Sequence, residues 1–188
     1  MSQKQPPRPL EDQEEFFKYG EVFSTIKQKL VREAESSGEN RERSREEAGT
    51  KSRKKEERAV TIVEALLATV VTAGDKSVDR SDAAAIQAAE VRATGQTNIM
   101  PGGLAATAQS AAQINAKPTT TKKTTLADVL SNAAAKLPKD RAVTRQDAEG
   151  VVGAEFRNNP NITTFPGGVA TSMVAAARIN KSLEQTTE

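Results

Sequence analysis

The chain has 188 residues, of which 36% are hydrophobic and 3% aromatic, so any core must be built mainly from small side chains. It contains no cysteine and no histidine, which excludes disulfides, thiolate nucleophiles and the commonest general base and metal ligand. With 27 basic and 25 acidic residues its formal net charge is +2, so the chain as a whole is not a basic nucleic-acid binder.

No targeting or membrane segment stands out near the N-terminus. Residues 1–10 are polar and proline-rich, without the apolar segment of a secretory signal. The longest apolar stretch, residues 59–73, is interrupted by Glu64 and is too short to span about 30 Å of hydrocarbon. We therefore expect a soluble, intracellular protein.

The first expected helix is amphipathic and covers residues 16–35, after a disordered lead at 1–15 that is rich in proline. Gly20 weakens the prediction of where this helix begins. Its apolar stripe, with spacings of three and four residues, consists of Phe16, Tyr19, Phe23, Ile26 and Leu30. The stripe either packs on the rest of the chain, which is the more usual role of such a face, or binds a partner.

Residues 36–58 contain eight basic residues, six acidic residues and a single alanine, so they cannot form a core. We interpret them as a solvated charged linker. The run Lys51–Lys55 has a second interpretation, as a nuclear-import signal or a patch that contacts phosphates. The linker interpretation is favoured because Glu56 and Glu57 follow at once.

The rest of the chain is a tandem repeat, in which residues 78–115 match residues 143–180 at a constant shift of 65 positions without a gap. A repeated segment is one supersecondary unit used twice, so the two copies should fold alike. The expected boundaries are 59–115 for the first repeat, 116–123 for a linker, 124–180 for the second repeat and 181–188 for a disordered tail. The fold class is therefore all-α, with two tandem three-helix repeats of marginal stability.

Capping boxes mark the first helix of each repeat, because a Thr is followed three residues later by a carboxylate. The boxes are Thr61 with Glu64 and Thr125 with Asp128. The apolar stripes that follow are Ile62, Leu66, Val70 and Ala73 in the first copy and Leu126, Leu130, Ala133 and Leu137 in the second. Gly74 and Pro138 are expected to end these helices.

A second helix begins in each repeat at a similar signal, which is Asp79 with Asp82 in the first copy and Thr144 with Asp147 in the second. These helices should end near residues 93–95 and 158–160. Small residues, Ala85 and Gly150, allow close helix approach. The pairs Glu90 with Arg92 and Glu155 with Arg157 recur two residues apart, so their members face different sides of the helix. We expect Arg92 and Arg157 to cap or bridge to a neighbouring helix.

A third helix is expected to open at Pro101–Gly103 and at Pro166–Gly168, with proline in the first helical turn. The glycines allow another backbone to come close, and Asn115 and Asn180 end the two repeats. An anion site at these helix N-termini is the alternative interpretation of the glycines. That signal is weak, because no strand precedes them and no Lys-Ser/Thr pair follows.

Residues 72–95 resemble the signature of the seed maturation protein family, a branch of the plant late embryogenesis abundant proteins. Residues 143–157, 166–168 and 175–180 resemble the last repeat of that family. Family members often carry three repeats, and residues 18–23 are similar to the opening of a missing first one, while Ser77 stands where proline is expected. The resemblance implies accumulation in maturing seeds, protection during water loss, a cytosolic and nuclear location, and no enzymatic activity.

The sequence thus favours a non-catalytic protectant that gains helix as water is lost, because a chain with few large apolar groups gains little from burial in dilute solution. Its expected partners are client proteins or membrane surfaces, bound nonspecifically, together with weak self-association and no small-molecule substrate. The alternative is a small helical interaction domain that binds a protein or nucleic acid in the nucleus. We assign no catalytic, cofactor-binding or metal-binding residues and expect no cofactor, since Asp79 and Asp82 are better explained as helix caps.

Overall fold

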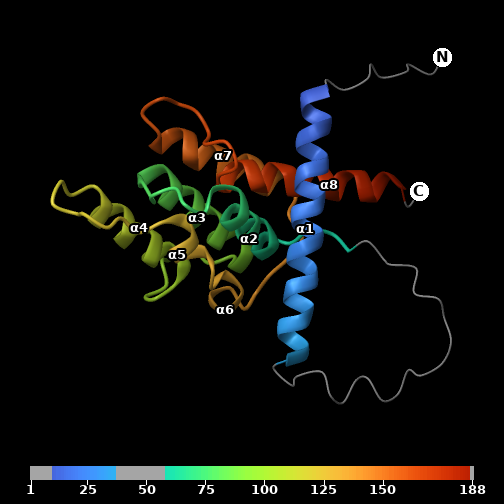
Figure 1. The fold of residues 1–188 in the computed structure, drawn as a ribbon, viewed down its shortest axis with the longest axis horizontal. Coiled ribbons are helices and arrows are strands. Elements are labelled where there is room, and N and C mark those ends of the chain that lie inside the picture. The colour runs from blue at the N-terminus through green and yellow to red at the C-terminus, as the bar shows by residue number, and fades with distance from the viewer. Residues whose placement is uncertain (1–9, 37–57, 187–188) are drawn as a thin grey trace.

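The computed structural model describes residues 10–36 and 58–186, and within these ranges the chain folds into α-helices without any extended sheet (Figure 1). The prediction of an all-α fold is confirmed. The helices are α1 (Leu10–Ser36), α2 (Ile62–Ala73), α3 (Arg80–Thr94), α4 (Leu104–Asn115), α5 (Leu126–Leu130), α6 (Ala133–Lys136), α7 (Arg145–Asn158) and α8 (Val169–Thr186). None of these described helices has the length and hydropathy needed to cross a membrane.

Each of the four expected helix starts carries its capping box. At α2, the Thr61 hydroxyl accepts a hydrogen bond from the amide of Glu64 at 3.3 Å, and the Glu64 carboxylate accepts one from the amide of Thr61 at 2.9 Å. The same reciprocal pair is present at α3, α5 and α7. Satisfied amides at these ends explain why the sequence pattern located the helices well.

One prediction for the second repeat is wrong, because the expected helix from Leu126 to Leu137 is broken into α5 and α6. The break lies at Ser131 and Asn132, where the Asn132 backbone leaves the helical region at φ −102° and ψ 20°. The Ser131 hydroxyl donates to the Ala127 carbonyl, so a side chain competes for that backbone acceptor. α6 ends at Lys136, since Pro138 disfavours helical backbone at the residue that precedes it, Leu137.

The two repeats are interlocked rather than stacked in series. The segment before α2 pairs antiparallel with the segment before α7, through the bridge between Thr61 and Ala142. The segment before α3 pairs with the segment before α5, through the bridge between Ser77 and Thr125. Each repeat therefore supplies one strand-like segment to each bridge.

The backbone hydrogen bonds of the two bridges obey a pseudo-two-fold relation. Ile62 donates to the Arg141 carbonyl at 3.0 Å, and its counterpart Leu126 donates to the Lys76 carbonyl at 2.8 Å. Val143 likewise donates to the carbonyl of Val60 at 3.0 Å. Its counterpart Val78 donates to that of Thr124, also at 3.0 Å. Moving every donor and acceptor of one bridge by 64 or 65 positions therefore gives the donors and acceptors of the other bridge.

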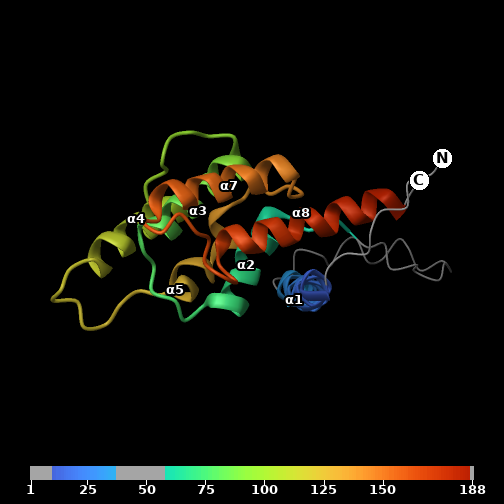
Figure 2. The ribbon, with the colours of Figure 1, turned by 90° about the horizontal axis from the view of Figure 1, so that it is seen from above.

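Around this centre α3 packs against α7, and each unit wraps its own third helix onto its second (Figure 2). The core is rich in alanine, as expected from composition, and every described helix contributes buried apolar side chains to it. The largest fully buried apolar side chains are Phe23, Ile62, Leu66, Ile86, Leu104, Leu126, Leu130, Leu137, Met173 and Val60.

The N-terminal helix α1 crosses the domain over α2 and α8, and it is seen end-on in Figure 2. Tyr19, Phe23 and Ile26 are buried against that surface, so the packing interpretation of the stripe is confirmed. The helix begins at Leu10 rather than near residue 16, so the predicted disordered lead is wrong for residues 10–15. It also runs through Gly20, where the surroundings are open. The side chain of Phe16 and most of the charged linker, including Lys51–Lys55, lie outside the described residues.

Candidate functional site

Asn115 and Asn180, the last residues of the two sequence repeats, hold the two bridges together. The Asn115 amide nitrogen donates to the carbonyls of Val78 at 2.9 Å and Thr124 at 2.8 Å, and its oxygen accepts from the Thr124 amide at 2.8 Å. Each asparagine therefore binds one segment from its own repeat and one from the other.

Asn180 makes the equivalent contacts on the other side of the pseudo-two-fold axis. Its nitrogen donates to the carbonyls of Val60 at 2.8 Å and Val143 at 2.9 Å, and its oxygen accepts from the Val60 amide at 2.6 Å. Both asparagines are buried, so each saturates backbone groups that water cannot reach. We call Asn115 and Asn180 the asparagine latches.

Buried glutamates occupy the N-termini of the third helices. Glu90 accepts hydrogen bonds from the amides of Leu104 at 3.0 Å and Ala105 at 3.1 Å. In the second repeat Glu155 accepts from Phe165 at 2.7 Å and Ala170 at 3.3 Å. A carboxylate of the chain itself thus takes the place that the alternative interpretation gave to a bound anion.

The glycines before the third helices serve this arrangement. A Cβ on Gly103 would lie 2.8 Å from the Glu90 carboxylate oxygen, so only glycine leaves room for it. Gly167 lies against the backbone of Thr72, whose hydroxyl donates to the Gly167 carbonyl at 2.6 Å. The predicted close backbone approach is confirmed at Gly167.

The predicted place of proline in the first helical turn is wrong. Pro101 lies outside α4, in a turn closed by a hydrogen bond from Gly103 to the Met100 carbonyl at 2.9 Å. Gly102 follows with φ +74°, which is the pattern of a type II turn with proline second and glycine third. The second copy repeats the turn at Pro166, with Gly167 at φ +74°.

Two further carboxylates, Asp82 and Asp147, are buried in the first turns of α3 and α7. Asp82 pairs with Lys76, and at the equivalent place Asp147 pairs with Arg141 at 2.6 Å. Arg92 also reaches Asp147 from α3 at 3.7 Å, so the predicted bridge to a neighbouring helix is confirmed for Arg92. Burial acts to raise the pKa of Asp147, but hydrogen bonds from Arg141 and Thr144 outweigh it and the pKa is lowered.

The small residues Gly150 and Gly153 of α7 face arginine side chains. The guanidinium carbon of Arg92 lies 2.8 Å from the position that a Cβ of Gly150 would take. Arg157 differs from Arg92, because it lies over Gly153 of its own helix, with one terminal nitrogen 3.1 Å from the Cβ position. The second arginine of the repeated pair therefore has a different role from the first.

The buried polar side chains form a network in which they bond one another and nearby backbone groups. Asp79 and Asp82, the paired carboxylates of the first repeat, hold helix amides and the Lys76 ammonium group. Within residues 10–36 and 58–186, no three side chains of the metal-ligating kinds cluster closely enough to hold an ion. What the network does chemically is to satisfy helix ends and bridge carbonyls without solvent.

Comparison with known proteins gives this duplicated unit a family. The profile described as "Seed maturation protein" matches the chain twice, at residues 60–118 and 124–183. The chain belongs to the seed maturation protein family. The resemblance inferred from residues 72–95, 143–157, 166–168 and 175–180 is therefore confirmed, and each match spans one copy of the repeat, with the second copy containing α5 and α6 where the first contains α2.

Relatives of this seed maturation protein carry the same type of name. Late embryogenesis abundant protein 47 of Arabidopsis thaliana is 67% identical over 129 residues, which cover 68% of this chain and 67% of the relative. Late embryogenesis abundant protein D-34 of Gossypium hirsutum is 68% identical over 126 residues, covering 66% of this chain and 48% of the relative. Late embryogenesis abundant protein 31 of Arabidopsis thaliana is 65% identical over 124 residues, covering 65% and 47%. The matched part thus spans about half the length of the last two, and no solved structure matches the chain.

Sequence reasoning missed the asparagine latches and the role of Glu90 and Glu155. The repeat did contain a signal for them, because all four residues recur at the shift of 65 positions although helix periodicity does not require them. Their partners lie in the other repeat or at the start of the next helix, so only the tertiary structure identifies what they bind.

Proposed function

We propose that this member of the seed maturation protein family is a non-catalytic protectant of cell components during seed maturation and desiccation, and that it gains helix as water is lost. Membership of the family and the names of its relatives support a role in late embryogenesis. The mechanism is our inference from the polar network.

The observation that carries the proposal is the internal saturation of helix ends. In an ordinary protein many terminal amides and carbonyls rely on water. Here buried carboxylates cap the starts of α4 and α8, and the asparagine latches bind the bridge carbonyls. Removing water therefore takes few hydrogen bonds from these elements, while it removes the competitor that favours unfolded backbone.

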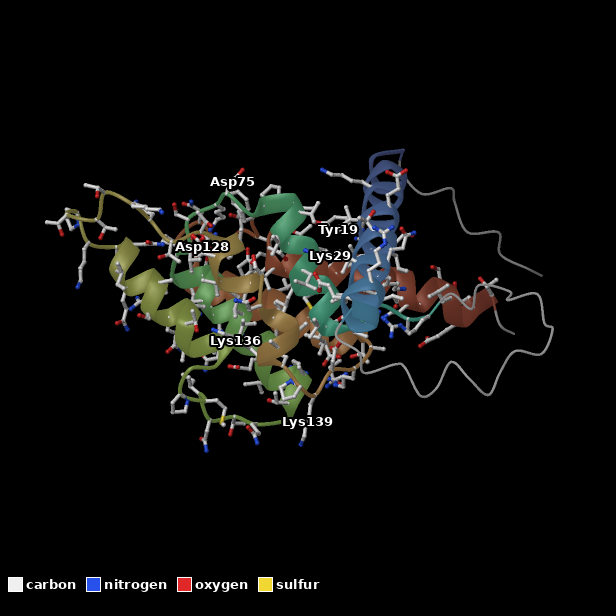
Figure 3. The ribbon with its side chains drawn as sticks, turned by 60° about the horizontal axis from the view of Figure 1, so that its bottom comes forward. Tyr19, Lys29, Asp75, Asp128, Lys136 and Lys139 are labelled. Carbon is white, nitrogen blue, oxygen red and sulfur yellow. The ribbon has the colours of Figure 1, made fainter. Side chains whose placement is uncertain are left out.

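The exterior suits nonspecific contact with other molecules. Charged side chains of both signs are exposed on different parts of the described chain, among them Lys29, Asp75, Asp128 and Lys139, which Figure 3 labels. Interspersed charges keep a protein from associating strongly in dilute solution. As hydration falls, the same groups can replace water at the surfaces of client proteins or at membrane headgroups.

A hydration series tests the proposal. Circular dichroism of the full chain should show more helix in the dried film than in buffer. A dehydration-sensitive client enzyme dried with the chain should keep more activity than the same enzyme dried with an equal mass of serum albumin. Helix content that is unchanged or lower on drying, or protection no better than that of albumin, would contradict the mechanism.

The alternative of a partner-binding helical domain has less support, because the surface expected to bind the partner, which includes Tyr19, Phe23 and Ile26, is buried against the domain.

We further propose residence in the cytoplasm and the nucleus, with the charged-linker interpretation of Lys51–Lys55 favoured over the import-signal interpretation. A fluorescent fusion in plant cells tests this. Replacing the four basic residues of Lys51–Lys55 with Gln should leave the nuclear share unchanged if the run is part of a linker, and a lower nuclear share would show that it is an import signal.

A further inference from the structure

Extensive contacts join the two repeats to each other. Both bridges pair a segment of the first repeat with a segment of the second. The packing of α3 on α7, of α2 on α8 and of α2 on α5 also joins the two repeats. Within this interface the Thr69 hydroxyl of α2 donates to the Ser172 hydroxyl of α8 at 3.1 Å, and both side chains are fully buried. A repeat separated from its partner would therefore expose much of its core.

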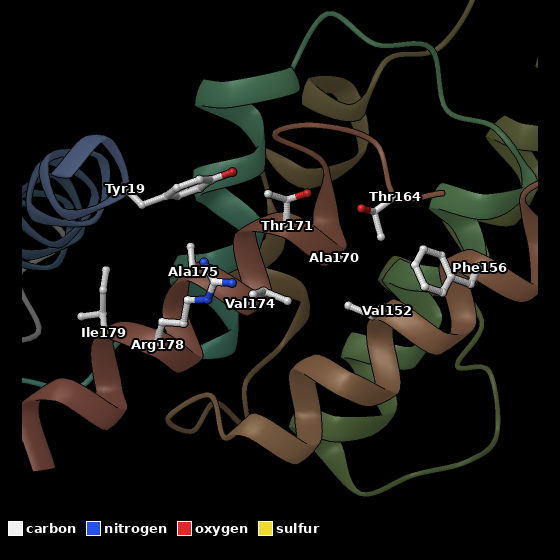
Figure 4. A pocket seen from close by; sticks show the side chains of 10 residues that line it. All are labelled: Tyr19, Val152, Phe156, Thr164, Ala170, Thr171, Val174, Ala175, Arg178 and Ile179. Atoms are coloured by element: carbon white, nitrogen blue, oxygen red, sulfur yellow. The ribbon is translucent and has the colours of Figure 1, made fainter. Parts of the chain in front are cut away.

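Each repeat is also held together by contacts of its own. In the first repeat α3 packs on α4, and in the second α7 packs on α8. Figure 4 shows Val152 of α7 beside Val174 of α8. Glu90 accepts amide hydrogen bonds at the start of α4, and Glu155 does so at the start of α8. These contacts lie within one repeat, so a change of partner leaves them intact.

The connection between the repeats is short and exposed. Residues 116–123 join Asn115, the last residue of α4, to Thr124, and every linker residue except Thr120 is exposed. Lys117 and Thr120 donate hydrogen bonds to the Ile114 carbonyl at 3.1 and 2.7 Å, so the linker turns back on the end of α4. The Asn115 latch holds Thr124 by direct hydrogen bonds. Thr124 of a second chain fits the same latch, because none of these bonds involves the linker.

An arginine contact selects which repeats can pair. Arg92 of the first repeat reaches Asp147 over Gly150 of the second, where a Cβ would lie 2.8 Å from the guanidinium carbon. In the first repeat Ala85 occupies the position equivalent to Gly150. Two first repeats, paired by the same pseudo-two-fold relation, would press the Ala85 methyl group against Arg92. A first repeat therefore pairs with a second repeat, within one chain or between two.

We propose that two copies of this chain exchange repeats and form a closed dimer, in which the first repeat of each chain pairs with the second repeat of the other through the same bridges and latches. The exchange requires the linker 116–123 to extend, and every contact between repeats has its equivalent in the dimer. A short flexible linker gives the partner repeat of the same chain an effective concentration of about 1 mM. The dimer should therefore accumulate as the protein approaches that concentration, which happens when water is withdrawn. This inference does not depend on the protective function.

Thiol trapping between two chains tests the exchange, because the natural chain has no cysteine. Full chains that carry only Thr69→Cys are mixed with full chains that carry only Ser172→Cys. The mixture is equilibrated at millimolar concentration in a thiol–disulfide redox buffer, with urea below the unfolding midpoint, and then diluted. Exchange places the two introduced thiols together, so a disulfide-linked dimer with an unchanged circular dichroism spectrum should form. The same mixture held at micromolar concentration should give almost none.

Two control proteins show what the trap reports. The double variant Thr69→Cys with Ser172→Cys should close its disulfide within one chain at micromolar concentration, which shows that the two positions can bond. Chains with Thr69→Cys alone should give no disulfide-linked dimer, because exchange places the two copies of position 69 in different halves of the dimer.

Absence of the mixed dimer at millimolar concentration, while the double variant closes its disulfide, would overturn the proposal. An equal yield of dimer from Thr69→Cys alone would overturn it as well, because the chains would then associate without exchange. Multi-angle light scattering provides a measurement that needs no substitution. The unmodified chain, equilibrated and diluted in the same way, should show a folded dimer, and a monomer at every concentration would contradict the exchange.

Discussion

At the scale of single residues, the asparagine latches carry the pairing of the two repeats. Each of these side chains makes three hydrogen bonds to backbone groups. All three hydrogen bonds of Asn180 are buried. An unsatisfied buried backbone group costs about 1–3 kcal/mol, so a latch contributes far more through the groups it saturates than through its own net bonds.

Asn180→Ala should lower the free energy of unfolding by about 3 kcal/mol, because the buried amide of Val60 and the buried carbonyl of Val143 lose the hydrogen bonds that Asn180 makes to them. Urea denaturation followed by circular dichroism measures the change. Asn158→Ala is the matched control, since that side chain bonds only a carbonyl of its own helix and should cost less than about 1 kcal/mol. Equal losses in the two variants would show that the latch has no special role.

The carboxyl group of Asp79 should make the stability of the folded state depend on pH. Although burial acts to raise its pKa, hydrogen bonds from Lys76 and Ser81 outweigh it and lower the pKa to about 2 from 3.8. Because the folded-state pKa lies below the unfolded one, the stabilisation is present above about pH 4 and disappears as the pH falls toward 2.

Asp79→Asn retains a good N-cap residue but should remove this contribution, which we place near 1 kcal/mol because the side chain is half exposed. Urea denaturation between pH 2 and pH 6 should therefore show a smaller rise in stability for the variant than for the original protein. Parallel pH curves for the two proteins would contradict the assignment.

At the scale of elements, Arg92 of α3 packs against Gly150 of α7, where its guanidinium group occupies the space that a larger side chain would need. Gly150→Ala would place a methyl group against the Arg92 guanidinium and separate it from Asp147. Alanine also favours a helix over glycine by about 1 kcal/mol, so the two effects oppose each other.

A double-mutant cycle separates these effects. In the original chain Gly150→Ala should be neutral or destabilising, whereas in the Arg92→Ala background it should stabilise the protein by about 1 kcal/mol. Thermal or urea denaturation of the four proteins gives the coupling. If Gly150→Ala has the same effect in both backgrounds, Arg92 does not depend on the glycine.

Helix α1 is an element that packs on the duplicated domain without belonging to either repeat. Phe23→Ala should weaken the packing of α1 on α2 and α8, because Phe23 is a buried aromatic side chain. The expected loss in the free energy of unfolding is up to about 3–5 kcal/mol. Hydrogen exchange should then quicken in α1 while α3 and α7 stay protected. Val31→Ala is the control, because Val31 is 54% exposed and its loss should leave exchange in α1 unchanged.

At the scale of the whole molecule, exchanged bridges make the two repeats one cooperative unit. In a linear repeat array each unit contacts its neighbours through one interface, and stability is shared out repeat by repeat. Here each repeat completes a bridge that begins in the other.

Because each repeat completes both bridges, we expect a substitution in one repeat to destabilise the other repeat as well. Asn115→Ala should lower amide protection in residues 126–180 as well as in residues 62–115, because Thr124 loses its latch. Native-state hydrogen exchange in low denaturant measures this. Loss of protection confined to the first repeat would show that the units fold independently.

The sequence by itself determined the helical class, the duplication, the capping boxes and the family, because these depend on local spacing and on a repeat visible at a fixed shift. Only the tertiary structure decided that the repeats exchange bridges, that Asn115, Asn180, Glu90 and Glu155 saturate the segments that meet there, and that α5 and α6 are separate. The physical reason is that a hydrogen bond between residues 120 positions apart, such as that between Val60 and Asn180, does not affect the helical periodicity of the sequence, so the periodicity cannot reveal which residues are partners. Local patterns specify which segments become helices, whereas the need to satisfy buried polar groups selects how those helices meet.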